Sequence, residues 1–374
     1  MVYNDFQELK LSALGMGTMR LPVIDGDNSR IDEEAAAKMT AYAMEKGINY
    51  YDTAWGYHGG NSEPVMGRVL GKYPRESFYL ATKFPGYDLA NMDKVEEIFE
   101  KQLERCGVEY FDFYLFHNVN EMNIDAYLDD EKYGIYTYLM KQKENGRIRH
   151  LGFSAHGTIE TMTRFLDAYG KDMEFCQIQL NWVDWSFQDA KGKVELLKKH
   201  NIPVWVMEPL RGGKLAKISG PNTARLKRLR PDEDVPAWSF RFLQSIEGVT
   251  MTLSGMSDEQ QMKENIATYE TYSPLNEEEM QQLLSIGESL VGGVPCTSCR
   301  YCVSECPQGL DIPNLLYLYN EFEYVGGGFL APMRIKVLPE NKRPHACVGC
   351  RSCEAVCPQN IRISEVMEDF AGKL

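Results

Sequence analysis

Four side chains that can take part in proton chemistry stand at the ends of three successive predicted strands. Asp52 ends the first of these three strands, residues 50–52, and Tyr57 follows in a glycine-rich loop. Lys83 and His117 end the other two. Each alone is compatible with an ordinary loop or strand end, but the four together favour an active site. A phenol has a pKa of ~10, and a cationic Lys nearby favours the phenolate and lowers that pKa. Because Asp52 can hold Lys83 in place and charged, the set could donate a proton to a carbonyl oxygen that accepts hydride.

The elements that must position these residues alternate between short apolar runs and helical patterns. The predicted strands are residues 11–16, 50–52, 78–83, 111–117, 148–154, 175–180, 202–207 and 249–253, and a helix is expected after each. Such alternation indicates a parallel sheet, and eight units over about 270 residues indicate an α/β fold, the closed (β/α)8 TIM barrel. The alternative is an open doubly wound sheet, although the first loop lacks its G-x-G-x-x-G signature. In a barrel the four residues would meet at the carboxyl ends of the strands, where active sites lie.

The cysteines are concentrated near the end of the chain, where eight of the ten fall in two C-x2-C-x2-C-x3-C-P runs. This spacing is typical of [4Fe-4S] clusters, and in two-cluster ferredoxins the fourth Cys of each run ligates the other cluster. We therefore expect one cluster on Cys296, Cys299, Cys302 and Cys357 and a second on Cys347, Cys350, Cys353 and Cys306. Zinc and disulfides are the competing interpretations. The change in composition predicts two domains, a barrel over residues 1–290 and a small, mainly helical domain over residues 291–374.

The barrel portion resembles the aldo/keto reductase family over roughly residues 6–290. The family's DTAxxY stretch is matched by residues 52–57, its strand-three Lys by Lys83, its strand-four His by His117, and its GxIRxxGxS pattern by residues 146–154. The resemblance implies that Tyr57 is the general acid, that Lys83 and Asp52 tune it, and that His117 orients the carbonyl. The cysteine-rich domain is similar to the helical dicluster ferredoxin module of succinate dehydrogenase iron-sulfur subunits.

The same resemblance implies a nicotinamide site. The residues expected in it are Ser154 and Gln177 at the carboxamide, Pro209, Leu210, Gly213 and Leu215 at the pyrophosphate, and Ser254, Gly255, Met256, Glu264 and Asn265 at the adenosine end. Three positions depart from the family pattern: Ala155 replaces an Asn, Met207 replaces a stacking Tyr, and Gly255 with Gln261 replace the cations that many members use for the 2′-phosphate. The choice between NADP(H), NAD(H) and no nicotinamide therefore stays open, as does a flavin.

Composition narrows the range of partners. The formal net charge is −14, which disfavours nucleic acid and anionic membrane as partners. No stretch reaches the ~20 apolar residues of a membrane span, and the first ten residues lack the apolar segment of a secretory signal, so a cytoplasmic protein is expected. The sequence thus predicts an iron-sulfur oxidoreductase that acts on a small-molecule carbonyl or alcohol, with a redox partner protein. The alternative is an electron-transfer or docking protein whose barrel no longer turns over a substrate.

Overall fold

The structure, a computed structural model, describes residues Met1 to Leu374 in two units, Met1–Ser285 and Ile286–Leu374. Helix α13 (Glu277–Leu290) contains the division between the units. The boundary expected between residues 290 and 291 stays a prediction. No helix combines the length and the apolar composition that a membrane crossing needs.

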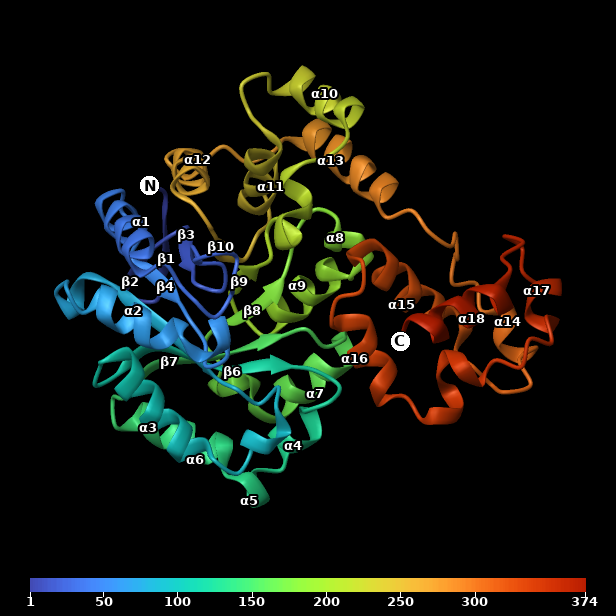
Figure 1. The fold of residues 1–374 in the computed structure, drawn as a ribbon, viewed down its shortest axis with the longest axis horizontal. Coiled ribbons are helices and arrows are strands. Elements are labelled where there is room, and N and C mark those ends of the chain that lie inside the picture. The colour runs from blue at the N-terminus through green and yellow to red at the C-terminus, as the bar shows by residue number, and fades with distance from the viewer. The chain divides into compact units, whose positions relative to one another are not determined.

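The first unit is a closed barrel of eight parallel strands, which confirms the predicted fold class (Figure 1). Neighbouring strands pair in chain order, and the last pairs with the first. The barrel strands are β3 (Leu14–Gly17), β4 (Tyr50–Asp52), β5 (Tyr79–Phe84), β6 (Phe111–Val119), β7 (Ile148–Ala155), β8 (Cys176–Gln179), β9 (Val204–Met207) and β10 (Val249–Gly255). Most of their residues are buried, as expected for strands that face a filled interior on one side and helices on the other.

Helices surround this barrel on its outer side (Figure 1). They are α1 (Glu33–Glu45), α2 (Ser62–Leu70), α3 (Val95–Cys106), α4 (Ile124–Leu128), α5 (Asp130–Tyr133), α6 (Ile135–Glu144), α7 (Ile159–Tyr169), α8 (Asp184–Phe187), α9 (Ala190–Lys199), α10 (Gly220–Leu229), α11 (Val235–Gln244) and α12 (Glu259–Tyr269). Local signals set several ends: the Asp32 side chain accepts from the Ala35 N–H at the start of α1, and Gly107 takes the left-handed φ of 63° that ends α3.

A hairpin of β1 (Tyr3–Phe6) and β2 (Leu9–Ser12) closes the amino-terminal end of the barrel. Phe6 on this hairpin is 5% exposed, and its ring lies 5.0 Å from Trp205 and 5.7 Å from Phe113. Aromatic rings in edge and tilted contacts at these separations are typical of a packed core. Because the hairpin covers the amino-terminal end of the barrel, the carboxyl ends of the strands are the end available for a site.

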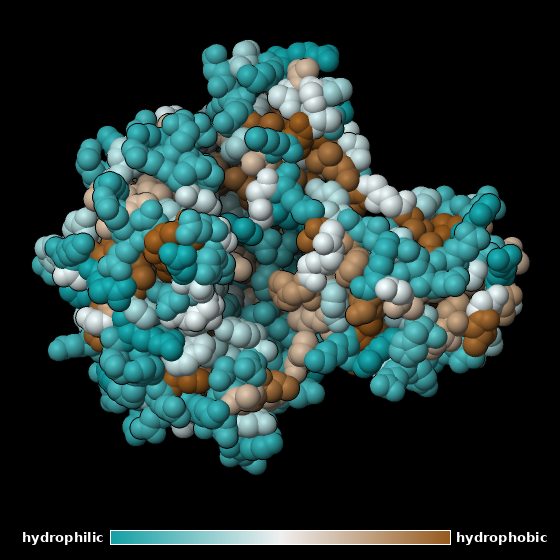
Figure 2. Space-filling model, viewed as in Figure 1, coloured by the Kyte–Doolittle hydropathy of each residue, from teal (hydrophilic) through white to brown (hydrophobic).

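The second unit is helical. Its helices are α14 (Tyr301–Ser304), α15 (Ile312–Val325), α16 (Leu330–Val337), α17 (Ser352–Ala355) and α18 (Ile363–Lys373). Leu315, Met367 and Phe370 are fully buried in its core, and six of the eight cysteines belong to this core or pack against it, while Cys299 and Cys350 are exposed. In the view of Figure 2, hydrophilic side chains cover most of the outer surface of each unit, in keeping with the acidic composition.

Candidate active site and cluster cavities

A buried ion pair joins the ends of two neighbouring strands. Lys83 on β5 donates from Nζ to Asp52 Oδ1 on β4 at 2.7 Å and to the Thr53 carbonyl, also at 2.7 Å. Neither side chain is more than 3% exposed. Burial lowers the pKa of Lys83 and raises the pKa of Asp52, and the attraction between the two charges opposes both shifts. The pair is therefore a buried, hydrogen-bonded contact at the carboxyl ends of β4 and β5.

Tyr57 and His117 lie beside this pair. Lys83 Nζ is 5.1 Å from the centroid of the Tyr57 ring, and that ring lies edge-on to His117 with the centroids 6.2 Å apart. The structure thus brings together the four residues that the sequence placed at successive strand ends. The ring of Tyr87, which sequence reasoning missed, lies 5.1 Å from His117. Its hydroxyl fills the space where a Cβ at Gly56 would lie, so it faces the same site.

The expectation that Lys83 lowers the pKa of Tyr57 is wrong for this structure. Burial, together with the negative charge of Asp52, raises the pKa of Tyr57 well above its usual value. The hydrogen bonds of the Lys83 ammonium go to Asp52 and to the Thr53 carbonyl, and none reaches the Tyr57 hydroxyl. Tyr57 is therefore a neutral phenol at physiological pH, which is the state that can donate a proton.

The backbone around Tyr57 is fixed by its neighbour His58. The His58 Nε2 accepts from the Leu21 N–H at 3.2 Å, which leaves the proton on Nδ1, and Nδ1 donates to the Asn28 carbonyl at 2.7 Å. His58 takes a positive φ of 55°, a conformation that costs free energy and that these contacts help to maintain. The loop that presents Tyr57 is therefore tied to the loop that follows β3.

A bulge in β6 orients His117. The pairing of β6 with β7 shifts register between Phe116 and Val119, and the Tyr127 hydroxyl donates to the His117 carbonyl at 2.9 Å. Burial and the nearby Lys83 lower the pKa of His117 well below its usual value, so the imidazole is neutral. Its Nδ1 makes no hydrogen bond within the protein.

Two of the residues expected at a nicotinamide carboxamide lie side by side. Ser154 on β7 and Gln177 on β8 pair in register, and both are buried. The Ser154 hydroxyl accepts from the Asn118 N–H at 2.8 Å, while the Gln177 Oε1 has no partner in the protein. Because a buried amide oxygen without a partner is costly, Gln177 fits a ligand that donates a hydrogen bond, as a carboxamide NH2 does.

The residues expected near the rest of a dinucleotide lie on two loops. Pro209, Leu210, Gly213 and Leu215 follow β9, where Gly213 takes a φ of 93°. Ser254, Gly255 and Met256 end β10 or follow it. Asn265 on α12 donates to the Ser254 hydroxyl at 3.2 Å, whereas Glu264 is exposed and accepts from Gln260.

Sequence reasoning missed a buried charge cluster between these strand ends. Asp184, at the start of α8, is fully buried and accepts from the Nε of Arg211 in the loop after β9 at 3.0 Å. The two residues are 27 positions apart in different loops, so no local pattern reveals the pair. The Asn181-x-x-Asp184 spacing could only have indicated a helix start, because Asn and Asp side chains often bond the backbone there. It does not indicate Arg211 as a partner.

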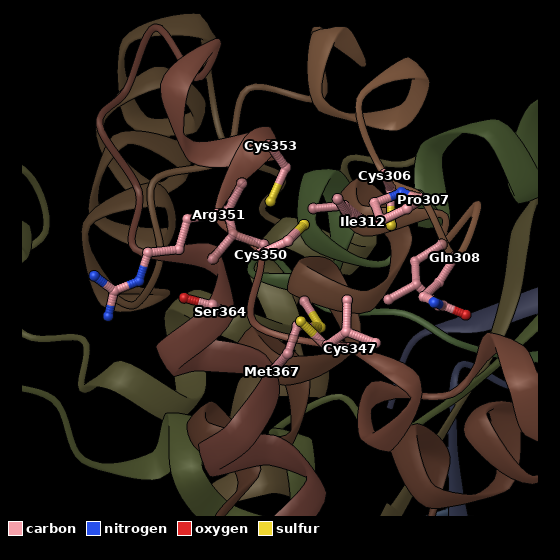
Figure 3. A pocket seen from close by; sticks show the side chains of 13 residues that line it. Cys306, Pro307, Gln308, Ile312, Cys347, Cys350, Arg351, Cys353, Ser364 and Met367 are labelled. Atoms are coloured by element: carbon pink, nitrogen blue, oxygen red, sulfur yellow. The ribbon is translucent and has the colours of Figure 1, made fainter.

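The cysteines of the second unit line two separate cavities in a crossed arrangement. One cavity is lined by Cys296, Cys299, Cys302 and Cys357. The other is lined by Cys347, Cys350, Cys353 and Cys306. In Figure 3 the labelled cysteines of this second cavity surround a common space, and the Arg351 side chain extends away from it. Four thiols around each apolar cavity are the donor set that a [4Fe-4S] cluster requires.

Comparison with known proteins decides the family. A model described as the aldo/keto reductase family matches residues 13–288. The chain belongs to the aldo/keto reductase family. A model described as a 4Fe-4S dicluster domain matches residues 295–362. In this member of the aldo/keto reductase family, the iron-sulfur domain follows the barrel in the chain.

Curated relatives match this aldo/keto reductase over part of their length. It is 27% identical over 234 residues to probable aldo-keto reductase 1 of Glycine max, covering 59% of the chain and 63% of the relative. It is 25% identical over 225 residues to the NADH-specific methylglyoxal reductase of Escherichia coli, covering 56% of the chain and 66% of the relative. The chain therefore spans slightly less than two thirds of the length of each of these two relatives.

Solved structures share the barrel. An aldo-keto reductase from Klebsiella pneumoniae in complex with NADPH aligns with a TM-score of 0.62 at 18% identity, covering 76% of this chain and 95% of that one. The holo form of a Bacillus halodurans aldo-keto reductase aligns with a TM-score of 0.61 at 24% identity, covering 76% and 96%. At these identities the likeness shows the fold alone. The comparisons give no support for a flavin.

Proposed function

We propose that the barrel reduces the carbonyl group of a small molecule with Tyr57 as the proton donor, and that the second unit carries electrons on two [4Fe-4S] clusters. The observation that carries the first part is the buried Lys83–Asp52 pair beside a neutral Tyr57. Such a pair is costly to bury, and a cation next to a protonated phenol is what proton donation to a carbonyl needs.

Reduction adds a hydride to the carbonyl carbon and a proton to its oxygen. Tyr57 gives the proton and becomes a phenolate as the substrate oxygen takes it. The Lys83 ammonium, 5.1 Å from the ring centroid, stabilises the negative charge that develops on the phenol. Asp52 holds Lys83 there, and the neutral His117 orients the substrate oxygen by a hydrogen bond.

The residues present fit a nicotinamide, which when bound supplies the hydride. Ser154 and Gln177 would hold its carboxamide, with the free Gln177 Oε1 as an acceptor. The loop from Pro209 to Leu215 would follow the pyrophosphate. Ser254, Gly255 and Met256, with Glu264 and Asn265, would meet the adenosine end, and the choice between NADH and NADPH is part of the test below.

The residues of the second unit fit two clusters, which when bound transfer single electrons. Cys296, Cys299, Cys302 and Cys357 would ligate one, and Cys347, Cys350, Cys353 and Cys306 the other, because each set lines one cavity. Since clusters pass single electrons and nicotinamide passes hydride, we propose that the clusters exchange electrons with a separate redox partner protein.

The test is the Tyr57→Phe variant, which removes the proton and keeps the ring. Reduction of a panel of aldehydes and ketones is measured with NADH and with NADPH in anaerobically purified protein. We expect kcat/KM to fall by about 10² or more, the usual contribution of a general acid. Tyr79 lies at the end of β5 that is opposite to Lys83. Tyr79→Phe is therefore the matched control, and we expect it to keep wild-type activity. Unchanged activity in Tyr57→Phe would reject the role of this phenol.

A further inference from the structure

The loop after β9 is tied to the loop after β8 by a buried carboxylate. Asp184 Oδ2 accepts from Asn181 Nδ2 at 2.6 Å and from Gln179 Nε2 at 2.8 Å, and Arg211 Nε lies 3.0 and 3.1 Å from the two carboxylate oxygens. The side chains of Asp184 and Arg211 are 0% and 3% exposed. The same Asn181 amide also donates to the Glu208 carbonyl at 3.1 Å, which connects the cluster to the backbone of the loop.

This loop needs outside contacts to keep its shape. Glu208 and Arg211 take φ values of 54° and 47°, and Gly212 and Gly213 take 66° and 93°. A left-handed φ at a residue with a side chain costs free energy and persists only when the surroundings enforce it. The Arg211 side chain is 3% exposed, and its Nε donates to the Asp184 carboxylate. The conformation of the loop therefore depends on the Asp184 contact.

We infer that Asp184 is a positioning residue that holds the 208–215 loop in the conformation that binds the pyrophosphate of a dinucleotide. The inference rests on the proposed function, which places the pyrophosphate along this loop. Asp184 is fully buried, so the role we infer for it is indirect. It acts through Arg211 and, by way of Asn181, through the Glu208 carbonyl. The ordered loop offers its backbone to the phosphates without first having to rearrange.

The direct test compares Asp184→Asn with Asp112→Asn. Asp112 is a matched control because it too is a buried carboxylate paired with arginine, Arg75, but it lies at the start of β6, at the other end of the barrel. Both variants lose a buried charge pair, so both are expected to melt at a lower temperature than wild type. Asn181→Ser is the milder variant, since it removes the amide that joins Asp184 to Glu208 and keeps the ion pair.

Two readouts separate positioning from stability. Titration with NADH and NADPH gives Kd, and hydrogen exchange gives the opening of residues 208–216. If the loop is competent in about one molecule in ten, the apparent Kd rises about tenfold. We expect that rise, with faster exchange in this segment, in Asp184→Asn and Asn181→Ser, and neither change in Asp112→Asn. At saturating dinucleotide kcat should stay close to wild type, because Tyr57, Lys83 and His117 are untouched.

Three outcomes contradict the inference in different ways. Wild-type Kd and wild-type exchange in Asn181→Ser and in folded Asp184→Asn would refute the positioning role and leave the proposed function in place. An equal rise of Kd in Asp112→Asn would show that general destabilisation, and not the loop, weakens binding. If wild-type protein bound neither NADH nor NADPH, the inference and the nicotinamide part of the proposed function would both be rejected.

Discussion

Replacing Cys357 by Ala tests the crossed arrangement of cysteines most sharply. Cys357 belongs by sequence to the second cysteine run, yet it lines the cavity of Cys296, Cys299 and Cys302. The structure therefore predicts that this variant damages the cluster of the first run and spares that of the second. A ligation without crossing predicts the opposite.

The size of the effect follows from the stoichiometry. Two cubanes give about eight iron atoms per chain, so loss of one whole cluster leaves about four, and conversion to a three-iron cluster leaves about seven. Iron and sulfide analysis of anaerobic protein gives the total. Alkylation of the native protein followed by peptide mass spectrometry shows which cysteines have lost their metal.

Where Cys357→Ala loses the whole cluster and about four iron atoms remain, we expect labelling of Cys296, Cys299 and Cys302, with Cys347, Cys350 and Cys353 protected. Cys306→Ala is the matched control and should give the reverse pattern, because Cys306 lines the other cavity. Labelling of the second run in Cys357→Ala, with the first run protected, would refute the crossed arrangement. Near-stoichiometric zinc in place of iron would reject the clusters altogether.

Three further outcomes are expected. Lys83→Met leaves Asp52 buried without its cation, which should lower the free energy of unfolding at pH 7 by about 3–5 kcal/mol. Urea unfolding should show a smaller loss at lower pH, where Asp52 is protonated. Unchanged stability at pH 7 would contradict the buried pair. Because burial raises the pKa of Tyr57, the phenol itself, followed by ultraviolet difference absorbance of wild type against Tyr57→Phe, should not ionise between pH 6 and about 10; ionisation of this phenol near pH 8 would show that Lys83 lowers its pKa after all. Burial disfavours the charge of Glu174, but hydrogen bonds from His150, Lys143 and Gln7 outweigh it and lower the pKa to about 2. Its stabilising effect should be full above the unfolded pKa of ~4.3 and disappear as pH falls through about 2, so the Tm difference between wild type and Glu174→Gln should shrink over that window, and a constant difference would count against it.

The sequence was most informative where local pattern and burial agree. The predicted helix 159–169 and strand 50–52 coincide with α7 and β4. The hairpin was missed because β1 has four residues and is defined by its pairing with β2, and the predicted strand 11–16 is in fact divided between β2 and β3. Helix α10, a polar segment with a single buried residue, Leu226, carried too weak an apolar pattern to be predicted.

Residue types predicted the contents of the site better than its electrostatics. Adjacent strands β4 and β5 bring Asp52 and Lys83 together, as their places at successive strand ends indicated. The direction of the Tyr57 pKa could not be predicted, because it depends on how far the phenol is removed from water. The Asp184–Arg211 pair was missed for a related reason: it joins two loops that only the closed barrel brings together.

The two cysteine runs depend on each other for a geometric reason. In each run two cysteines precede a left-handed arginine, Arg300 with φ 67° or Arg351 with φ 62°, and the third lies on the short helix that begins just after it. The fourth cysteine follows a short helix, α14 or α17, that carries it away from its own loop and into the other cavity. Ile363 lines both cavities and forms a shared wall. Neither cavity is complete without both runs, so the unit can bind its clusters only when the two halves have folded together.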